Sequence, residues 1–159
     1  MFVYLVHHGH AVNPGVDPQR PLSRLGRDQA DTLSGRAAVR GVRPDVIWHS
    51  GKLRARQTAD AYWRACNPLA EFCATRWMQP DDPLRLADLL QVETRDLMVV
   101  GHMPHLDRLL RRLVEAGPQA GSFPVNGVVA VERIETGWAE RWRLEADPGG
   151  TGRATGGSP

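Results

Sequence analysis

Three short, continuous apolar runs limit the folds that this chain of 159 residues can adopt. Residues 2–6, 45–48 and 96–100 are dominated by aliphatic and aromatic side chains, with no regular alternation between polar and apolar positions. Strands that are buried on both faces have this pattern, and they occur mainly in parallel sheets that helices cover. Each run therefore predicts an interior strand of a parallel sheet.

Segments with helical signals separate these strands. Ser23 is suited to cap a helix over residues 24–40, because its hydroxyl can accept a hydrogen bond from a free backbone N–H. The apolar stripe of that helix is expected to consist of Leu25, Ala30, Leu33 and Ala37. Further helices are expected over residues 52–66 and 84–92, and after Pro104, which fits a first helical turn. The alternation predicts a three-layer α/β/α sandwich with a mostly parallel central sheet.

The rest of the chain completes one expected domain over residues 1–146. Residues 72–78 are expected to form an edge strand. Residues 125–134 and 138–144 alternate in part and flank a turn that contains glycine, so they predict a C-terminal antiparallel hairpin. Residues 147–159 are rich in glycine and are expected to be a disordered tail.

Charge and composition argue against several classes of function. The 20 basic and 18 acidic residues leave a formal charge of +2, which predicts no affinity for nucleic acid or for a membrane surface. Cys66 and Cys73 are too few for a zinc site and give no disulfide framework. No run approaches the roughly 18 apolar residues of a membrane span, and no basic leader precedes the first strand. We therefore expect a cytoplasmic protein.

Polar segments follow the three interior strands. They are residues 7–10 (HHGH), 49–58 (HSGKLRARQT) and 101–104 (GHMP). In open α/β sheets, ligands bind outside the carboxyl ends of the strands. We therefore expect His8, Ser50 and His102 to lie at one rim of the sheet.

The motifs in this order resemble the histidine phosphatase superfamily, which has the phosphoglycerate mutase-like fold. The resemblance is greatest to its small SixA-type phosphohistidine phosphatases. Residues 7–9 (HHG) stand where the family has RHG, and residues 20–26 (RPLSRLG) are similar to its RPLTxxG. Residues 50–58 (SGKLRARQT) are similar to SPxxRAxQT, and residues 100–104 (VGHMP) complete the set. The resemblance covers residues 2 to 145, and four ordered motifs make chance agreement improbable.

The resemblance implies a two-step hydrolysis of phosphate esters or phosphoramidates. His8 attacks phosphorus to give a phosphohistidine, which water then hydrolyses, and the scheme requires neither metal nor cofactor. Arg54 and His102 match the positions that hold the phosphoryl oxygens and assist catalysis. Arg20 matches a further phosphate-binding arginine. Gly9, which lacks a Cβ, is expected to let the backbone approach the phosphate closely.

His7 departs from the family pattern, because it replaces the arginine of the first motif. A neutral imidazole offers one donor where guanidinium offers a rigid charged fork. Loss of such a charge-assisted bond costs about 1.5–3 kcal/mol, or roughly ten- to a hundredfold in rate or affinity. A protonated His7 would compensate in part, and turnover would then fall as pH rises past neutrality. The alternative is a phosphate-binding or regulatory module with little or no activity.

The general acid and the substrate are less constrained by the sequence. Asp81 and Asp82 are the candidate acids, because they lie in the middle of the chain where larger family members place a carboxylate. A phosphohistidine substrate would need less help, since imidazole is a better leaving group than an alkoxide. The expected partner is therefore a phosphorylated protein or a small phosphorylated molecule. A mutase activity fits less well, because it is associated with longer chains.

The other histidines suggest no metal site. Neighbouring strand residues such as His7 and His8 point to opposite faces, and no acidic residue adjoins them in sequence. His10, His49 and His105 are expected to be rim or capping residues.

Overall fold

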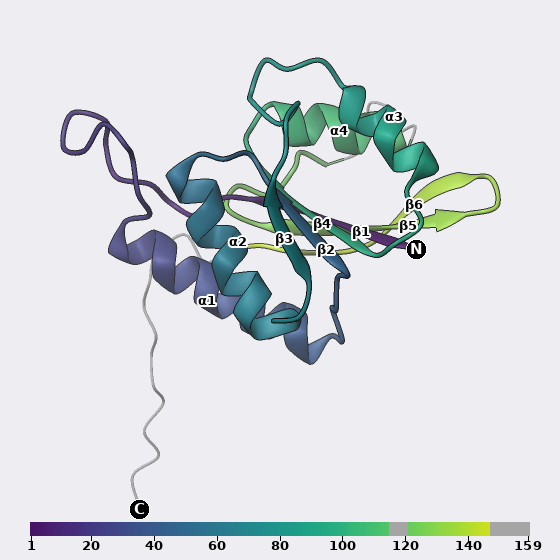
Figure 1. The fold of residues 1–159 in the computed structure, drawn as a ribbon, viewed down its shortest axis with the longest axis horizontal. Coiled ribbons are helices and arrows are strands. Elements are labelled where there is room, and N and C mark those ends of the chain that lie inside the picture. The colour runs from purple at the N-terminus through teal and green to yellow at the C-terminus, as the bar shows by residue number, and fades with distance from the viewer. Residues whose placement is uncertain (115–120, 147–159) are drawn as a thin grey trace, which may run out of the picture.

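The computed structural model describes residues 1–114 and 121–146, and it contains a six-stranded mixed sheet in the order β3-β2-β4-β1-β5-β6 (Figure 1). Strands β1 to β4 pair in parallel, whereas β5 pairs antiparallel with β1 and with β6. The predicted parallel sheet with a C-terminal antiparallel hairpin is thus confirmed. The strand bounds are β1 Phe2–His7, β2 Val46–His49, β3 Glu71–Ala74, β4 Leu97–Gly101, β5 Val128–Ile134 and β6 Gly137–Leu144.

Helices cover both faces of the sheet. In Figure 1, α1 and α2 lie below the sheet, and α3 and α4 lie above it. The alternation of side chains along β1 explains this division, since Val3 and Leu5 belong to the apolar cluster of α3 and α4, and Tyr4 and Val6 to that of α1 and α2. The three-layer sandwich is therefore confirmed. The helix bounds are α1 Arg24–Val39, α2 Leu53–Cys66, α3 Arg85–Val92 and α4 His105–Leu113.

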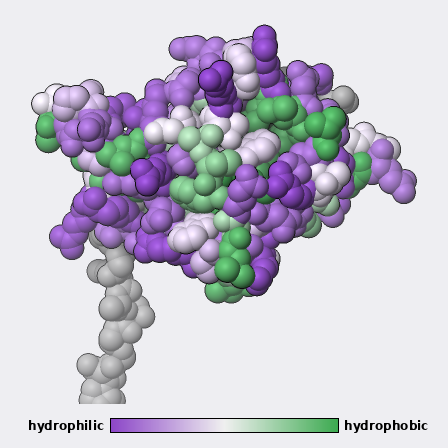
Figure 2. Space-filling model, in the orientation of Figure 1, coloured by the Kyte–Doolittle hydropathy of each residue, from purple (hydrophilic) through white to green (hydrophobic). Residues whose placement is uncertain are grey.

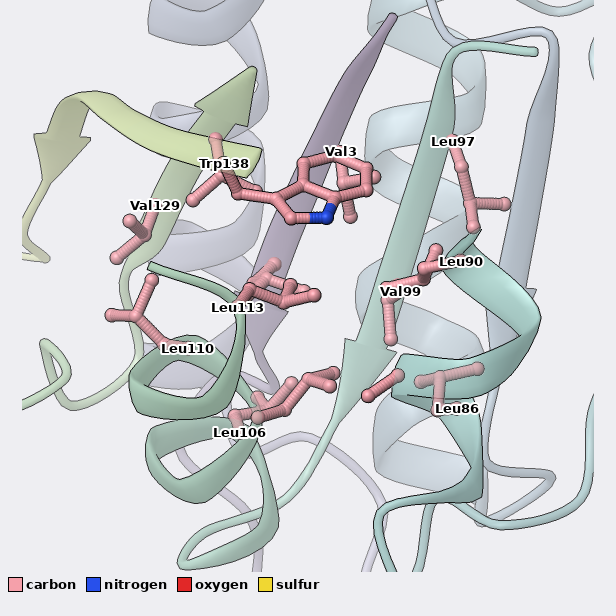
Figure 3. Packing of buried hydrophobic residues seen from close by; sticks show 14 of the residues in the cluster. Val3, Leu86, Leu90, Leu97, Val99, Leu106, Leu110, Leu113, Val129 and Trp138 are labelled. Atoms are coloured by element: carbon pink, nitrogen blue, oxygen red, sulfur yellow. The ribbon is translucent and has the colours of Figure 1, made fainter. Parts of the chain in front are cut away.

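The cluster beneath α3 and α4 packs around the centre of the sheet. Figure 3 shows Leu106, Leu110 and Leu113 of α4 directed at β1, with Leu86 and Leu90 of α3 on the side of β4. All five leucines are almost fully buried. Burial of a leucine stabilises a fold by about 1.5–3 kcal/mol, so this layer holds the central strands firmly in register.

Helix α1 begins where the sequence predicts. The Ser23 hydroxyl accepts a hydrogen bond from the Gly26 N–H at 3.1 Å, which makes Ser23 the N-cap. The apolar stripe differs in one respect, because Leu25 is only half-buried while Gly26 is buried. Gly26 is the residue that contacts the loop after β1, and a hypothetical Cβ on it would lie 2.0 Å from the carbonyl oxygen of His10.

Three boundaries differ from the predictions. The edge strand β3 ends at Ala74, four residues before the expected end. Strand β5 begins at Val128 rather than at residue 125, because Asn126 has a φ of 53° and turns the chain before the strand starts. Pro104 is the N-cap of α4 and lies just outside its first turn. The tail that we expected to be disordered, residues 147–159, lies outside the described residues.

The strand register brings several chain segments to one rim. His7 of β1 is paired with Gly101 of β4, and Val100 of β4 is paired with His49 of β2. The carboxyl ends of these three strands therefore lie side by side. Val6 is paired with Val128, so the segment that leads into β5 reaches the same rim.

Hydrophilic residues cover most of the face shown in Figure 2, and the hydrophobic residues on it form separate groups. Within the described residues, no helix has both the length and the apolar character needed to cross a bilayer.

Candidate active site

His8 stands directly after β1 with a defined ring orientation. Its Nδ1 lies 2.7 Å from the carbonyl oxygen of Gly9. A carbonyl only accepts, so Nδ1 carries the proton and donates it in this bond. Arg54 donates from Nε to the His8 Nε2 at 3.2 Å, which again requires a lone pair on Nε2. The structure therefore selects the tautomer in which Nε2 is an unprotonated nitrogen facing a guanidinium group.

The surroundings of His8 keep its imidazole neutral. Burial is the largest cause, and it is reinforced by the positive charges of Arg54, Arg20 and Lys52. The hydrogen bond to Gly9 opposes these effects only in part, and the pKa of His8 falls to about 4. A neutral imidazole is the form that can act as a nucleophile.

Thr58 connects Arg54 to Gly9, the residue after His8. The Thr58 hydroxyl donates to the carbonyl oxygen of Arg54 at 2.9 Å and accepts from the Gly9 N–H at 3.0 Å. Thr58 lies one turn after Arg54 in α2, so this pair of bonds fixes the start of α2 against the loop after β1. Arg54 itself is only 8% exposed. Burial is the largest cause that lowers the pKa of its guanidinium, and the charge of Arg20 lowers this pKa further.

His102 reaches the same place from the end of β4. Its ring meets that of His8 edge to face, with centroids 5.0 Å apart. The Nε2 of His102 and the hydroxyl of Ser50 are joined by a buried hydrogen bond of 2.6 Å. Burial first, and the charges of His8 and Arg54 after it, lower the pKa of His102 to about 2. Ser50 thereby fixes the orientation of a neutral, buried imidazole.

His7 is held by Asn126 at the start of the hairpin. The backbone N–H of Asn126 donates to the His7 Nδ1 at 2.8 Å, and its side-chain amide donates to the carbonyl oxygen of His8 at 2.7 Å. Because Nδ1 accepts, the proton of the neutral His7 ring lies on Nε2. Burial, followed by His8 and Arg54, lowers the pKa of His7 to about 3. These surroundings oppose the protonation of His7 that would compensate in part for the missing arginine.

Gly9 has a structural reason to be glycine that the sequence did not suggest. A hypothetical Cβ on Gly9 would lie 2.5 Å from the carbonyl oxygen of Gly26 at the start of α1. We expected Gly9 to allow close approach of a phosphate. The close approach that the structure shows is that of the α1 backbone.

Arg20 and Lys52 extend the positive charge of the site outward. Arg20 has a φ of 50° and donates from Nε to the carbonyl oxygen of Val12 at 3.2 Å. Its charge lowers the pKa of His8, Lys52 and Arg54. Arg20 and Arg54 line the same cleft.

The two candidate acids lie in the loop before α3. Asp82 accepts a hydrogen bond from the Gln79 N–H at 2.7 Å, and Asp81 is exposed. Gln79 also donates from its side chain to the Ser50 carbonyl oxygen at 3.0 Å, which connects this loop to the rim. Within the described part of the chain, no hydrogen bond joins either carboxylate to His8 or His102.

The remaining histidines have mixed roles. His10 lies 2.8 Å from the hydroxyl of Ser23, and the His49 ring accepts from the Gly51 N–H at 3.1 Å. Both contacts are those of rim or capping residues. His105 is fully buried at the start of α4, and its expected place at the rim was therefore wrong. Across residues 1–114 and 121–146, no group of three His, Cys, Asp or Glu side chains is arranged to hold a metal ion.

Comparison with known proteins shows which fold this chain shares. Residues 3–75 match the sequence model of the histidine phosphatase superfamily, branch 1. A structure assigned to the phosphohistidine phosphatase SixA of Agrobacterium tumefaciens is 26% identical, with a TM-score of 0.73, and the match covers 90% of this chain and 97% of that one. The chain has the histidine phosphatase fold.

Two further solved structures share this histidine phosphatase fold. The protein histidine phosphatase SixA complexed with tungstate is 21% identical with a TM-score of 0.78, over 91% of this chain and 97% of that one. The phosphoserine phosphatase of Entamoeba histolytica, in complex with 3-phosphoglyceric acid, is 15% identical with a TM-score of 0.69, over the same shares of the two chains. No curated protein sequence matches the chain.

Sequence reasoning did not assign two residues of this candidate site. Ser50 was expected at a strand end, but without a partner. Asn126 was placed inside a strand, although the Asn126-Gly127 pair is a turn signal that marks this position. The superfamily sequence model covers residues 3–75, so neither His102 nor Asn126 falls within that match.

Proposed function

We propose that this protein is a phosphatase that works through a phosphohistidine intermediate on His8. The observation that carries the proposal is the tautomer of His8, whose Nδ1–H is committed to the Gly9 carbonyl. The Nε2 of His8 therefore carries a lone pair, which accepts a hydrogen bond from the Nε of Arg54. This contact supports the assignment of His8 as the nucleophile and of Arg54 as the cationic group for the phosphoryl oxygens.

The first step transfers the phosphoryl group to His8. Nε2 forms a bond to phosphorus while the bond from phosphorus to the leaving oxygen or nitrogen breaks, and the leaving atom takes the electron pair. Arg54 stabilises the negative charge on the equatorial oxygens, and Arg20 adds charge from the loop before α1. The Nδ1–H bond to Gly9 stabilises the positive charge that develops on the ring.

The second step returns His8 to its starting form. A water oxygen attacks phosphorus, and the bond from phosphorus to Nε2 breaks. The electron pair of that bond returns to Nε2, and inorganic phosphate leaves. We assign His102, whose ring meets that of His8 edge to face, as a contact for a phosphoryl oxygen in both steps. Backbone around Gly9 and the Nε2–H of His7 are assigned as further phosphate contacts.

The substrate class that we favour is a phosphohistidine protein, with small phosphorylated molecules as the other class. The Asp82 carboxylate accepts a hydrogen bond from the Gln79 N–H in its own loop. Protonation of the leaving group by Asp81 or Asp82 would therefore need a rearrangement of this loop. An imidazole leaving group demands the least proton donation. This favours cleavage of a phosphorus–nitrogen bond over an ester bond.

One trapping experiment tests the intermediate. The protein is incubated with an aryl phosphate or a phosphohistidine peptide, quenched in alkali, and assayed for protein-bound phosphate that acid releases. The wild type and His10→Ala should both carry it, because His10 is exposed and its hydrogen bonds among the described residues are to Ser23 and Gln29. His8→Ala should carry none and should lose turnover. Turnover by His8→Ala at the wild-type rate would refute the proposal.

A specific observation favours a second candidate, the phosphate-binding module. His7 replaces a clamping arginine, and its Nδ1 is already used as an acceptor for Asn126. His7 therefore offers a phosphate one neutral donor in place of a charged fork. Phosphate binding by the wild type, without turnover and without trapped phosphate, would favour the module.

A further inference from the structure

A cleft with basic walls adjoins Arg54. It has a volume of about 560 Å³ and is lined by the side chains of Arg20, Lys52, Arg54 and Arg56, with no Asp or Glu among its lining residues. In the proposed reaction, Arg54 contacts the oxygens of the phosphoryl group on His8. Lys52 and Arg56 take no part in the two steps proposed above.

These four cations lack the ion pairs that five arginines elsewhere in the protein form. Arg64, Arg95, Arg111, Arg141 and Arg143 are each paired with a carboxylate. Within residues 1–114 and 121–146, no ion pair involves any of the four cations in the cleft. The terminal nitrogens of Arg54 also form no hydrogen bond there, and the residue as a whole is 8% exposed.

The start of α2 makes this concentration of positive charge more costly. Lys52 is the N-cap of α2, and the first turn of the helix contains no acidic residue. The amino-terminal end of a helix carries partial positive charge, so acidic side chains stabilise it and basic ones do not. Burial and the charges of Arg54 and Arg20 lower the pKa of Lys52, and Asp81 and Asp82 oppose this only in part. A bound anion would relieve this repulsion.

Lys52 and Arg56 lie on the same side of the helix start. They are four residues apart, and the Arg56 N–H donates to the Lys52 carbonyl oxygen at 3.0 Å. Positions with this spacing are neighbours on a helix surface. The cleft thus continues from the buried Arg54 to a pair of more exposed cations, in a space that extends beyond one phosphoryl group.

We propose that this cleft binds a second anionic group of the substrate, a carboxylate or phosphate next to the transferred phosphoryl group, through Lys52 and Arg56. The inference rests on the proposed function of His8 and narrows the substrate class. The second anion has two sources, which are an acidic residue beside a phosphohistidine in a protein and a carboxylate on a small phosphorylated molecule.

Two matched pairs of substrates test the inference. One pair is phenyl phosphate and 3-carboxyphenyl phosphate, and the other is a phosphohistidine peptide with Glu or with Gln beside the phosphohistidine. The member with the extra carboxylate should have the higher kcat/KM by about tenfold, as expected for one charge-assisted contact. The pair with the larger ratio identifies the source. The preference should weaken as salt is added.

Variants assign the preference to the two cations. In the Lys52→Met/Arg56→Met double variant, the ratio of the two kcat/KM values should fall towards one. Arg64→Met is the matched control, because Arg64 lies near the other end of α2 and is paired with Asp60 at 3.0 Å. That control should keep the wild-type ratio. A double variant that retains the full preference would overturn the inference.

A binding measurement separates this inference from the proposed function. Calorimetry with the His8→Ala variant compares the affinity for phenyl phosphate and 3-carboxyphenyl phosphate, neither of which it should hydrolyse. Tighter binding of the carboxylated compound, lost in a variant that also carries Lys52→Met and Arg56→Met, supports the second anion site even if the wild type shows no turnover. Equal affinities for the two compounds would refute the site, whatever the activity of the wild type.

Discussion

The side-chain amide of Asn126 donates a hydrogen bond of 2.7 Å to the carbonyl oxygen of His8, which lies 118 positions earlier in the chain. The N–H of the same residue bonds His7. One residue at the entrance to β5 therefore holds both histidines of the first motif. Its φ of 53° is a conformation that Asn tolerates better than most residues.

Asn126→Gly removes the side-chain amide and keeps both the backbone N–H and the unusual φ. We expect kcat/KM to fall about fivefold, since one hydrogen bond contributes about 1 kcal/mol. Asn126→Ala should lower the free energy of unfolding further, because alanine is strained at this φ. Steady-state kinetics and chemical unfolding measure the two effects. Unchanged kinetics in Asn126→Gly would show that the amide does not position His8.

His7→Arg restores the charged fork of the first motif. We expect kcat/KM to rise about tenfold or more, through a charge-assisted contact to the phosphoryl group. The structure adds a cost, because arginine cannot accept from the Asn126 N–H. The free energy of unfolding should fall by about 1–3 kcal/mol.

His7→Gln is the control for that prediction. Its carbonyl oxygen can accept from Asn126, but it brings no charge. We expect it to retain most of the stability without the gain in rate. If His7→Gln and His7→Arg raise the rate equally, the absence of the arginine charge does not limit this protein.

Much of the fold could be predicted because its signals are local. The buried strands appear in sequence as unbroken apolar runs, and Ser23 marks the start of α1 by its capping chemistry. The meeting of His8, Arg54 and His102 follows from the parallel order of the strands, which brings their carboxyl ends to one rim. Their placement required no knowledge of side-chain packing.

The contacts that could not be predicted all join distant segments. The bond between Ser50 and His102 depends on the register of β2 against β4, and nothing near Ser50 signals it. The role of Asn126 depends on how the hairpin meets β1. Whether His7 is protonated depends on burial, which a short motif does not reveal.

Gly26 offers a test of how tightly α1 is packed against the loop after the nucleophile. A Cβ at residue 26 would lie 2.0 Å from the His10 carbonyl oxygen, so Gly26→Ala must displace backbone. We expect a loss of about 2–3 kcal/mol in the free energy of unfolding, as for overpacked cores, and a fall in kcat. Gly35→Ala is the matched control in the same helix, where a Cβ meets nothing within 4 Å. It should stabilise the protein by about 0.5–1 kcal/mol; equal effects would contradict the packing argument.

Stability should decrease as the solution becomes acidic. In the unfolded chain the histidines bind protons near their ordinary pKa of 6.5, whereas in the folded protein the pKa of His8 is about 4, that of His7 about 3 and that of His102 about 2. Below pH 6.5 the unfolded state therefore binds more protons than the folded state. The free energy of unfolding decreases as the pH is lowered below 6.5. Chemical unfolding across this range measures the slope. His7→Gln should make the slope shallower, and a wild-type stability that does not change between neutral and mildly acidic pH would contradict the lowered pKa values.

The pH dependence of kcat/KM reports the ionisation of His8 before substrate binds. Attack on phosphorus requires the neutral ring, and burial lowers the pKa of His8 to about 4. We therefore expect kcat/KM, corrected for ionisation of the substrate, to stay level from neutrality down to about pH 5 and to fall below it. Circular dichroism at each pH confirms that the protein is folded. An acid limb near the ordinary histidine pKa of 6.5 would mean that His8 is more solvated than the structure indicates, or that another group performs the attack.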